Sequence, residues 1–152
     1  MSEHASSSQD ASSFAPASGE GGCLCGAVRY RLARVPRQVV HCHCAQCRRA
    51  AGAPVVTWAT VREAEFAIVE GEPAWFASSD HGKRGFCPRC GTQLLFVSTR
   101  YPGAVDVTAA SLDHPERLAP LRHTFAPERI AWLEMSDGLP RHVGDSKSPR
   151  LP

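Results

Sequence analysis

Three cysteines stand within six positions in the stretch HCHCAQC, residues 41–47. A structural zinc ion is usually held by four protein ligands, whereas a catalytic zinc ion has three and keeps one position open for water or substrate. Cys42, Cys44 and Cys47 are therefore candidate zinc ligands. The chemistry of their site depends on whether a fourth ligand comes from elsewhere in the chain.

Two further pairs of cysteines have the spacing of zinc ligands: Cys23 and Cys25 in GGCLCGAV, and Cys87 and Cys90 in FCPRCG. In an extended chain, residues i and i+2 point to the same side. The first pair can thus reach the sulfur–sulfur separation of roughly 3.8 Å that a tetrahedral zinc ion requires. The second pair can do so through a tight turn, since Gly91 accepts the backbone angles that such a turn often imposes.

The seven cysteines can make one closed site of four ligands and leave three over. Spacing alone does not decide which pairs combine. Cys44 and Cys47 with Cys87 and Cys90 would form a CxxC…CxxC set, although the gap between these pairs is long for a zinc ribbon. Burial of all seven as small apolar side chains is a weaker alternative, because the cysteines are clustered.

Polar side chains flank the three-cysteine stretch. His41 and His43 would point away from the sulfur atom of Cys42 in an extended segment, so neither is expected to bind the same zinc ion. Each can carry a proton near the thiols, or be a packed histidine with a satisfied hydrogen bond. Arg48 and Arg49 follow on a short helix, where they can meet the carboxylates of a ligand or lie on a solvated face.

Short strands must position these residues. In AVRYRLA, Val28, Tyr30 and Leu32 alternate with polar positions, which is typical of a half-buried strand. Further strands are predicted at residues 39–41, 55–61, 65–70, 74–78, 93–98 and 104–110.

One short helix is predicted over AQCRRAAG, because Gly52 and Pro54 are typical of a helix end. The expected fold class is therefore mainly β, with several short antiparallel strands and one or two short helices.

The chain has 152 residues, 43% of them hydrophobic, which suffices for one domain with an ordinary core. Residues 1–19 are rich in serine and alanine, so we expect a disordered tail there. Residues 20–143 are the expected zinc-binding domain, and residues 144–152, GDSKSPRLP, an expected flexible C-terminus.

Composition argues against several classes of partner. The net charge is only +2 and no basic run is present, so a nucleic-acid partner is not expected. A membrane partner is not expected either, since no apolar run approaches the roughly 18 residues that cross a bilayer, and no signal peptide is recognisable. We expect a cytoplasmic protein, in which an odd number of cysteines favours metal ligation over disulfides.

Five stretches resemble the glutathione-dependent formaldehyde-activating enzyme family, which is also named for its centromere protein V member. They are GGCLCGAVRY, HCHCAQCRRAAGAP, FCPRCGTQL, VDVTAASLDHPE and AWLEMSDGLP. The match extends from Gly21 to His142 and includes all seven cysteines of the family. The resemblance implies a single zinc-stapled, mostly β domain, similar to that of the B-type methionine sulfoxide reductases.

The resemblance also implies two zinc ions with different roles. The structural zinc ion would be bound by Cys23, Cys25, Cys87 and Cys90. The catalytic zinc ion, with an open position, would be bound by Cys42, Cys44 and Cys47.

The implied activity is that of a carbon–sulfur lyase, which joins a small thiol, such as glutathione, to formaldehyde or another small aldehyde. Three thiolates and Zn²⁺ sum to a formal charge of −1, so the centre is a weak Lewis acid suited to holding a substrate thiol. Coordination would convert that thiol into a nucleophilic thiolate.

Two other functions fit the same residues. In the first, the chain is a non-enzymatic module in which both zinc ions are structural and the surface binds a partner. In the second, the three-cysteine site stores or senses labile zinc. The enzyme is favoured over the binding module because the chain has no long basic extension.

Overall fold

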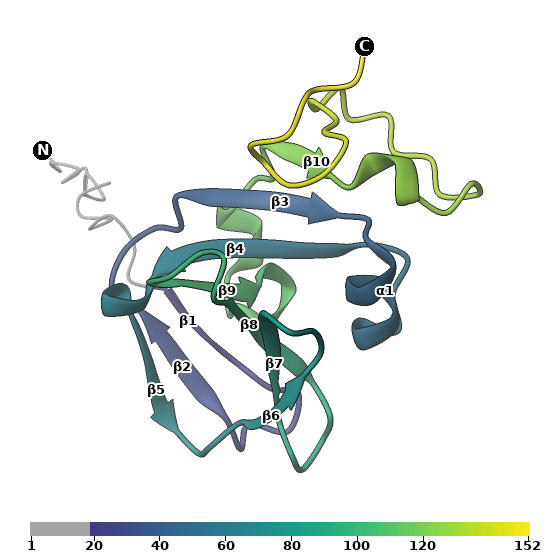
Figure 1. The fold of residues 1–152 in the computed structure, drawn as a ribbon. Coiled ribbons are helices and arrows are strands. Elements are labelled where there is room, and N and C mark those ends of the chain that lie inside the picture. The colour runs from purple at the N-terminus through teal and green to yellow at the C-terminus, as the bar shows by residue number, and fades with distance from the viewer. Residues whose placement is uncertain (1–18) are drawn as a thin grey trace, which may run out of the picture.

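The structure, a computed structural model, describes residues 19–152. The predicted tail lies outside this part of the chain, except for Gly19, with which the first strand begins. The described chain is mainly β, with two sheets and one short α-helix (Figure 1). None of its helices is long and apolar enough to span a membrane.

The smaller sheet has three antiparallel strands in the order β1-β2-β5. Their bounds are β1 (Gly19–Gly22), β2 (Arg29–Leu32) and β5 (Phe66–Glu70).

The larger sheet has seven strands in the order β10-β3-β4-β9-β8-β7-β6. In that order they are β10 (Arg122–Thr124), β3 (Gln38–Cys42), β4 (Val56–Arg62), β9 (Ala104–Thr108), β8 (Gln93–Ser98), β7 (Gly82–Phe86) and β6 (Ala74–Ala77). All neighbours are antiparallel except β10 and β3, which run parallel. The predicted mainly β fold of several short antiparallel strands is confirmed, and the one parallel pair of the described strands lies at this edge, where β10 follows a long connection after β9.

The helix α1 (Ala45–Ala51) connects β3 to β4 and ends at Gly52, whose φ of 61° is left-handed as the sequence predicts. Four short 3-10 turns complete the chain: η1 (Glu63–Glu65), η2 (Ala109–Ser111), η3 (Pro115–Arg117) and η4 (Ala126–Glu128).

The main core lies between the two sheets. Val28, Tyr30 and Leu32 are at most 1% exposed and pack against Ala59 and Val107 of the larger sheet. The alternation predicted for this segment is therefore confirmed, since its polar positions face outward.

A second apolar cluster lies on the opposite face of the larger sheet. Val40, Val56 and Trp58 are buried there together with Cys42 and Cys47. Residues next to each other in β3, such as Val39 and Val40, thus belong to different clusters. The second cluster supplies the apolar surroundings of the three-cysteine stretch.

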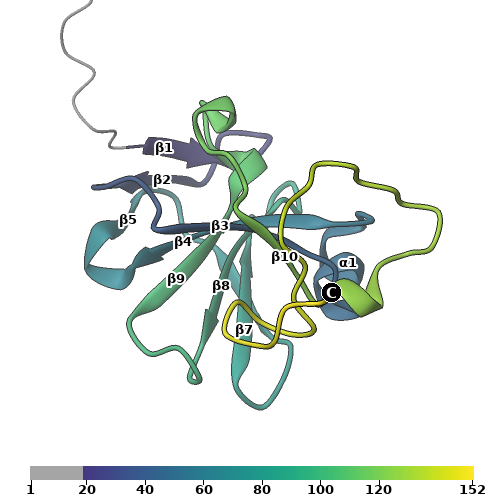
Figure 2. The same ribbon diagram turned by 90° about the horizontal axis from the view of Figure 1, so that it is seen from above.

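The C-terminal segment lies beside β10 in both views of the fold (Figures 1 and 2). Residues 144–152, which the sequence predicts to be flexible, are hydrogen-bonded to this edge. Gly144 accepts from the backbone of Phe125 at 2.8 Å, and the Leu151 amide donates to Arg141 at 2.7 Å. The amide of Val143 donates to Pro149 at 3.0 Å.

Ending the chain after Val143 should therefore lower its stability. The three backbone hydrogen bonds named above contribute about 0.5–1.5 kcal/mol each, so from these bonds alone we expect a loss of roughly 1.5–4.5 kcal/mol and a Tm lower by roughly 3–18 °C. Thermal unfolding followed by circular dichroism measures this. Lys147→Ala, which keeps these backbone bonds, serves as the control. An unchanged Tm in the shortened chain would show that the segment is flexible in solution.

Candidate metal centres

The first metal centre, the four-cysteine cluster, consists of Cys23, Cys25, Cys87 and Cys90. Their sulfur atoms all lie within 4.8 Å of one another, with Cys25 Sγ 3.6 Å from Cys23 Sγ and 3.8 Å from Cys87 Sγ. These separations suit four ligands of one tetrahedral zinc ion. The cluster joins the turn between β1 and β2 to the turn between β7 and β8, and so links the two sheets.

Two tight turns shape the four-cysteine cluster. Gly26 and Gly91 have φ values of 77° and 75°, which side-chain-bearing residues rarely adopt. The Gly91 amide donates to the carbonyl of Cys87 at 2.9 Å, which closes the second turn. The Val28 amide lies 3.2 Å from Cys23 Sγ, and the hydroxyl of Thr92 lies 3.1 Å from Cys90 Sγ. Such hydrogen bonds stabilise thiolates, the form in which cysteine binds metal.

The second metal centre, the three-cysteine cluster, consists of Cys42, Cys44 and Cys47. Cys42 ends β3, Cys44 is the N-cap of α1, and Cys47 lies in the first turn of that helix. The cap is extended, with φ −60° and ψ 145°, and its sulfur accepts from the Cys47 amide at 3.3 Å. No further His, Cys, Asp or Glu of residues 19–152 joins the three within 4.8 Å. This cluster can hold a zinc ion with one ligand position left for another molecule.

The three thiols interact strongly with one another. Hydrogen bonds from Cys42 and Cys44 hold the pKa of Cys47 far below its usual range, and the nearby guanidinium of Arg84 lowers it further. Hydrogen bonds to Cys44 and Cys47, together with burial, raise the pKa of Cys42. Of the three thiols, Cys47 most favours the thiolate form, and it is the one that lies beside Arg84.

Arg84 of β7 is the cation beside this charge. Its side chain is 5% exposed, and its Nη1 and Nη2 atoms lie 3.7 and 3.6 Å from Cys47 Sγ. The guanidinium also lies over the ring of Phe96, 4.9 Å from the centroid. Arg84 was not among the residues expected at the site. Arg84 follows Cys47 by 37 positions, so no short motif connects the two residues in the sequence. The strand that carries Arg84 was also not predicted.

Asp106 lies in the same row of side chains across the sheet. Arg84 is paired with Phe96, Phe96 with Asp106, and Asp106 with Thr60. The hydroxyl of Thr60 donates to the Asp106 carboxylate. Burial raises the pKa of Asp106 to about 6, against the hydrogen bond from Thr60 that lowers it, and the charge of Cys47 adds to the increase. A carboxyl group with this pKa can exchange protons near neutral pH.

The histidines lie on the other side of β3 from the sulfur atoms, as alternation predicts. His43 is fully buried, and its Nε2 atom lies 2.9 Å from Nδ1 of His123 in β10. Nε2 of His123 lies 2.9 Å from the carboxylate of Asp137. His41 Nδ1 is instead 2.9 Å from Thr57 Oγ1. Neither His41 nor His43 belongs to a metal-binding group of the described residues.

The hydrogen-bond pattern fixes which nitrogen atoms carry protons if both imidazoles are neutral. Asp137 can only accept, so His123 carries its proton on Nε2, and His43 donates from its own Nε2 to His123 Nδ1. Burial, together with the neighbouring histidines, lowers the pKa of His43 to about 4. These hydrogen bonds connect His43, which lies between Cys42 and Cys44, to His123 of β10 and through it to Asp137.

The first turn of α1 is also held by contacts with η4. Glu128 of η4 accepts from the Ala45 amide at 2.8 Å, which satisfies one of the free N–H groups of the helix end. Arg48 donates to the carbonyl of His43 at 3.0 Å and to that of Glu128 at 3.3 Å. Arg48 is therefore engaged with the backbone, while Arg49 is exposed. The loop with the three cysteines thus has protein contacts on both sides.

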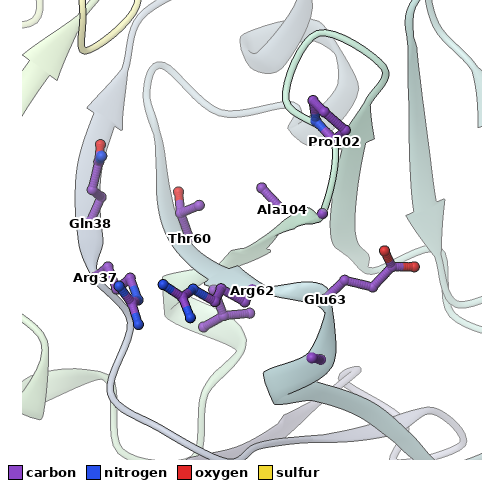
Figure 3. Close-up of a pocket in the computed structure, with 10 residues that line it drawn as sticks. Arg37, Gln38, Thr60, Arg62, Glu63, Pro102 and Ala104 are labelled. Carbon is purple, nitrogen blue, oxygen red and sulfur yellow. The ribbon is translucent and has the colours of Figure 1, made fainter.

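A pocket of about 540 Å³ lies at the other end of β3 and β4, lined by Gln38, Thr60 and Arg62 (Figure 3). No cysteine lines it, and its Arg37 lies 3.7 Å from Glu65 in an ion pair. The pocket is therefore separate from both metal centres.

Comparison with known proteins identifies the family of this chain. A relative from Halomonas elongata, named "Putative glutathione-dependent formaldehyde-activating enzyme", is 30% identical over 129 residues, which cover 76% of this chain and 80% of the relative. A crystal structure of a Rhodobacter sphaeroides protein matches with a TM-score of 0.57 and 25% identity, over 69% of this chain and 99% of that one. The model of the glutathione-dependent formaldehyde-activating enzymes matches residues 18–128. With most of its length matched and both cysteine clusters formed, this chain belongs to the glutathione-dependent formaldehyde-activating enzyme family.

Proposed function

We propose that the protein is a zinc-dependent carbon–sulfur lyase that joins a small thiol, such as glutathione, to formaldehyde or a similar small aldehyde. The observation that carries this proposal is the three-cysteine cluster, with three sulfur ligands and no fourth among the described residues. Family membership supports the choice of substrates, and so does the name of the Halomonas relative.

The proposed chemistry follows from the residues in and around the three-cysteine cluster. Zinc held by Cys42, Cys44 and Cys47 would supply a position at which the substrate thiol binds as a thiolate. The thiolate sulfur attacks the carbonyl carbon of the aldehyde, a carbon–sulfur bond forms, and the π electrons move to the oxygen. That oxygen takes up a proton to give the hydroxymethyl thioether. Asp106 lies in the row of side chains that includes Arg84, the neighbour of Cys47, and its pKa of about 6 would allow it to exchange this proton.

The four-cysteine cluster is proposed to hold a structural zinc ion. Its four thiolates complete the coordination shell, so no position remains for a substrate. It also joins segments that are 62 positions apart, Cys25 and Cys87, which gives its metal a role in folding. Both sites require free thiols, and this supports a location in the reducing cytoplasm.

Proton-exchange NMR on a mixture of glutathione and formaldehyde tests the proposed activity. Zinc-loaded protein should accelerate the interconversion of free and hydroxymethyl glutathione well above the spontaneous rate, because it offers the thiol in its nucleophilic form. Cys44→Ser, which removes a ligand of the proposed catalytic zinc ion, is the control. No acceleration with glutathione or other small thiols would overturn the proposal and favour the non-enzymatic binding module.

The two clusters should respond differently to loss of one ligand. Cys87→Ser removes a ligand that links distant segments, so zinc-binding free energy that is also folding free energy is lost, and we expect an insoluble or molten protein. Cys44→Ser should stay folded and carry about one zinc ion rather than two. Its loop is local, little loop closure depends on its metal, and β10 and η4 hold it independently.

Metal content by mass spectrometry, together with circular dichroism, measures this difference. Cys90→Ser and Cys47→Ser are the matched second variants of the two clusters. If Cys44→Ser unfolds the protein as completely as Cys87→Ser, both zinc ions are structural and the proposed roles are wrong.

A further inference from the structure

Arg84 is a buried cation without a carboxylate partner. Among residues 19–152, no Asp or Glu lies within ion-pair distance of its guanidinium, and its Nε atom has no hydrogen-bond partner. Its polar contacts are the two nitrogen–sulfur contacts with Cys47. An unpaired charge in a protein interior is strongly unfavourable, so a nearby negative charge must balance Arg84.

Asp106 does not supply that charge. Its hydrogen-bond donor is Thr60, and the ring of Phe96 lies between Asp106 and Arg84 in the row across the sheet. A guanidinium close to a carboxylate lowers its pKa, whereas the pKa of Asp106 is raised to about 6. The negative charge that balances Arg84 is therefore on the sulfur atoms of the three-cysteine cluster.

The two cysteine clusters differ in whether a cation contacts their sulfur atoms. The sulfur atoms of the four-cysteine cluster accept from the Val28 amide or contact the hydroxyl of Thr92, and no lysine or arginine of the described chain donates to them. Only the three-cysteine cluster has a guanidinium, and the ring of Phe96 fixes where it lies. Both observations place a cation at the cluster that has an open ligand position.

We propose that Arg84 is a positioning residue that balances the charge of the three-cysteine centre, so that the centre can accept a fourth, negatively charged sulfur ligand. This inference rests on the zinc binding in the proposed function. Zn²⁺ with three thiolates has a formal charge of −1, and a substrate thiolate would make it −2. With Arg84 included, these charges become 0 and −1. In a poorly solvated site, that difference favours binding of the anionic ligand.

Two substitutions at Arg84 and one control test this role. Arg84→Met keeps an unbranched side chain over Phe96 but removes the charge and both donors. Arg84→Lys keeps the charge but cannot direct two fixed N–H groups at one sulfur atom. Arg100→Met changes the net charge of the protein equally, and its side chain is exposed in the turn between β8 and β9. The four-cysteine cluster serves as an internal control in every variant.

The first readout is the zinc affinity of the three-cysteine cluster, measured by competition with a chromophoric chelator. Hydrogen bonds to charged groups stabilise more than neutral ones, so Arg84→Met should weaken zinc binding about tenfold to a hundredfold. Arg84→Lys should lie between Arg84→Met and the unchanged protein. Arg100→Met should bind zinc like the unchanged protein, and the four-cysteine cluster should keep its zinc throughout.

The second readout is the sulfur-to-metal charge-transfer band of Co²⁺-loaded protein during titration with glutathione. Arg84→Met should shift the band of the protein alone, because the Cys47 thiolate loses its donors. It should also raise the dissociation constant of glutathione more than tenfold, which Arg100→Met should not do. Circular dichroism of each variant confirms that it is folded. If Arg84→Met does not fold, Arg84→Lys decides by the same two readouts.

Neither readout requires formaldehyde, so this inference and the proposed activity can fail separately. Unchanged zinc affinity and an unchanged cobalt band in the folded variants would overturn the role of Arg84, even if the protein accelerates the thiol–aldehyde reaction. Weakened metal and thiol binding in Arg84→Met would support the role, even in a protein that shows no such acceleration.

Discussion

Along β3, successive side chains must point to opposite faces of the sheet, and this separates two kinds of chemistry that are adjacent in the sequence. Cys42 points to the face where Trp58 and Arg84 lie. The neighbouring His41 and His43 point to the opposite face, toward His123 of the adjacent strand β10. The candidate metal centre therefore consists of sulfur alone, since no imidazole of the described chain reaches the three sulfur atoms.

The imidazoles help to hold in place the loop that carries the three cysteines. His43 is fixed through His123 to Asp137, and Glu128 holds the first turn of α1. The loop between β3 and α1 is therefore held in place by protein contacts on the side away from the three sulfur atoms. Ligands that are already positioned lose less conformational entropy when a metal ion or a substrate binds.

Much of the fold and of both clusters could be predicted from the sequence. The segments that became β2, β4 and β9 were predicted as strands, with clear alternation in the first, and Gly52 ends α1 as predicted. Spacing placed the cysteines in zinc-binding groups, but it left the pairing of the groups open. The resemblance implied the partition into four and three, and the structure brings the same two sets together.

The strands that were not predicted explain why the sequence could not place two residues of the site. β7 has the sequence GKRGF, which does not predict a strand because glycine has a low propensity for β-structure. Packing requires these glycines, because a Cβ atom at Gly82 would lie 2.7 Å from Phe96 and one at Gly85 only 3.0 Å from Leu95. β10 has only three residues and forms by pairing with a distant strand. Arg84 and His123 lie on these two strands, so their part in the site depended on tertiary contacts that no local pattern shows.

The three cysteines and His123, which helps to hold their loop, are far apart in the sequence. They are therefore synthesised at different times. The three cysteines leave the ribosome together, whereas His123 follows His43 by 80 positions. At the usual rate of about 5–20 residues per second, that interval is on the order of ten seconds. A nascent chain in this interval has the three thiols without β10 beside them. Zinc captured that early would meet a flexible loop, and the centre would gain its final shape only when the last strand pairs with β3.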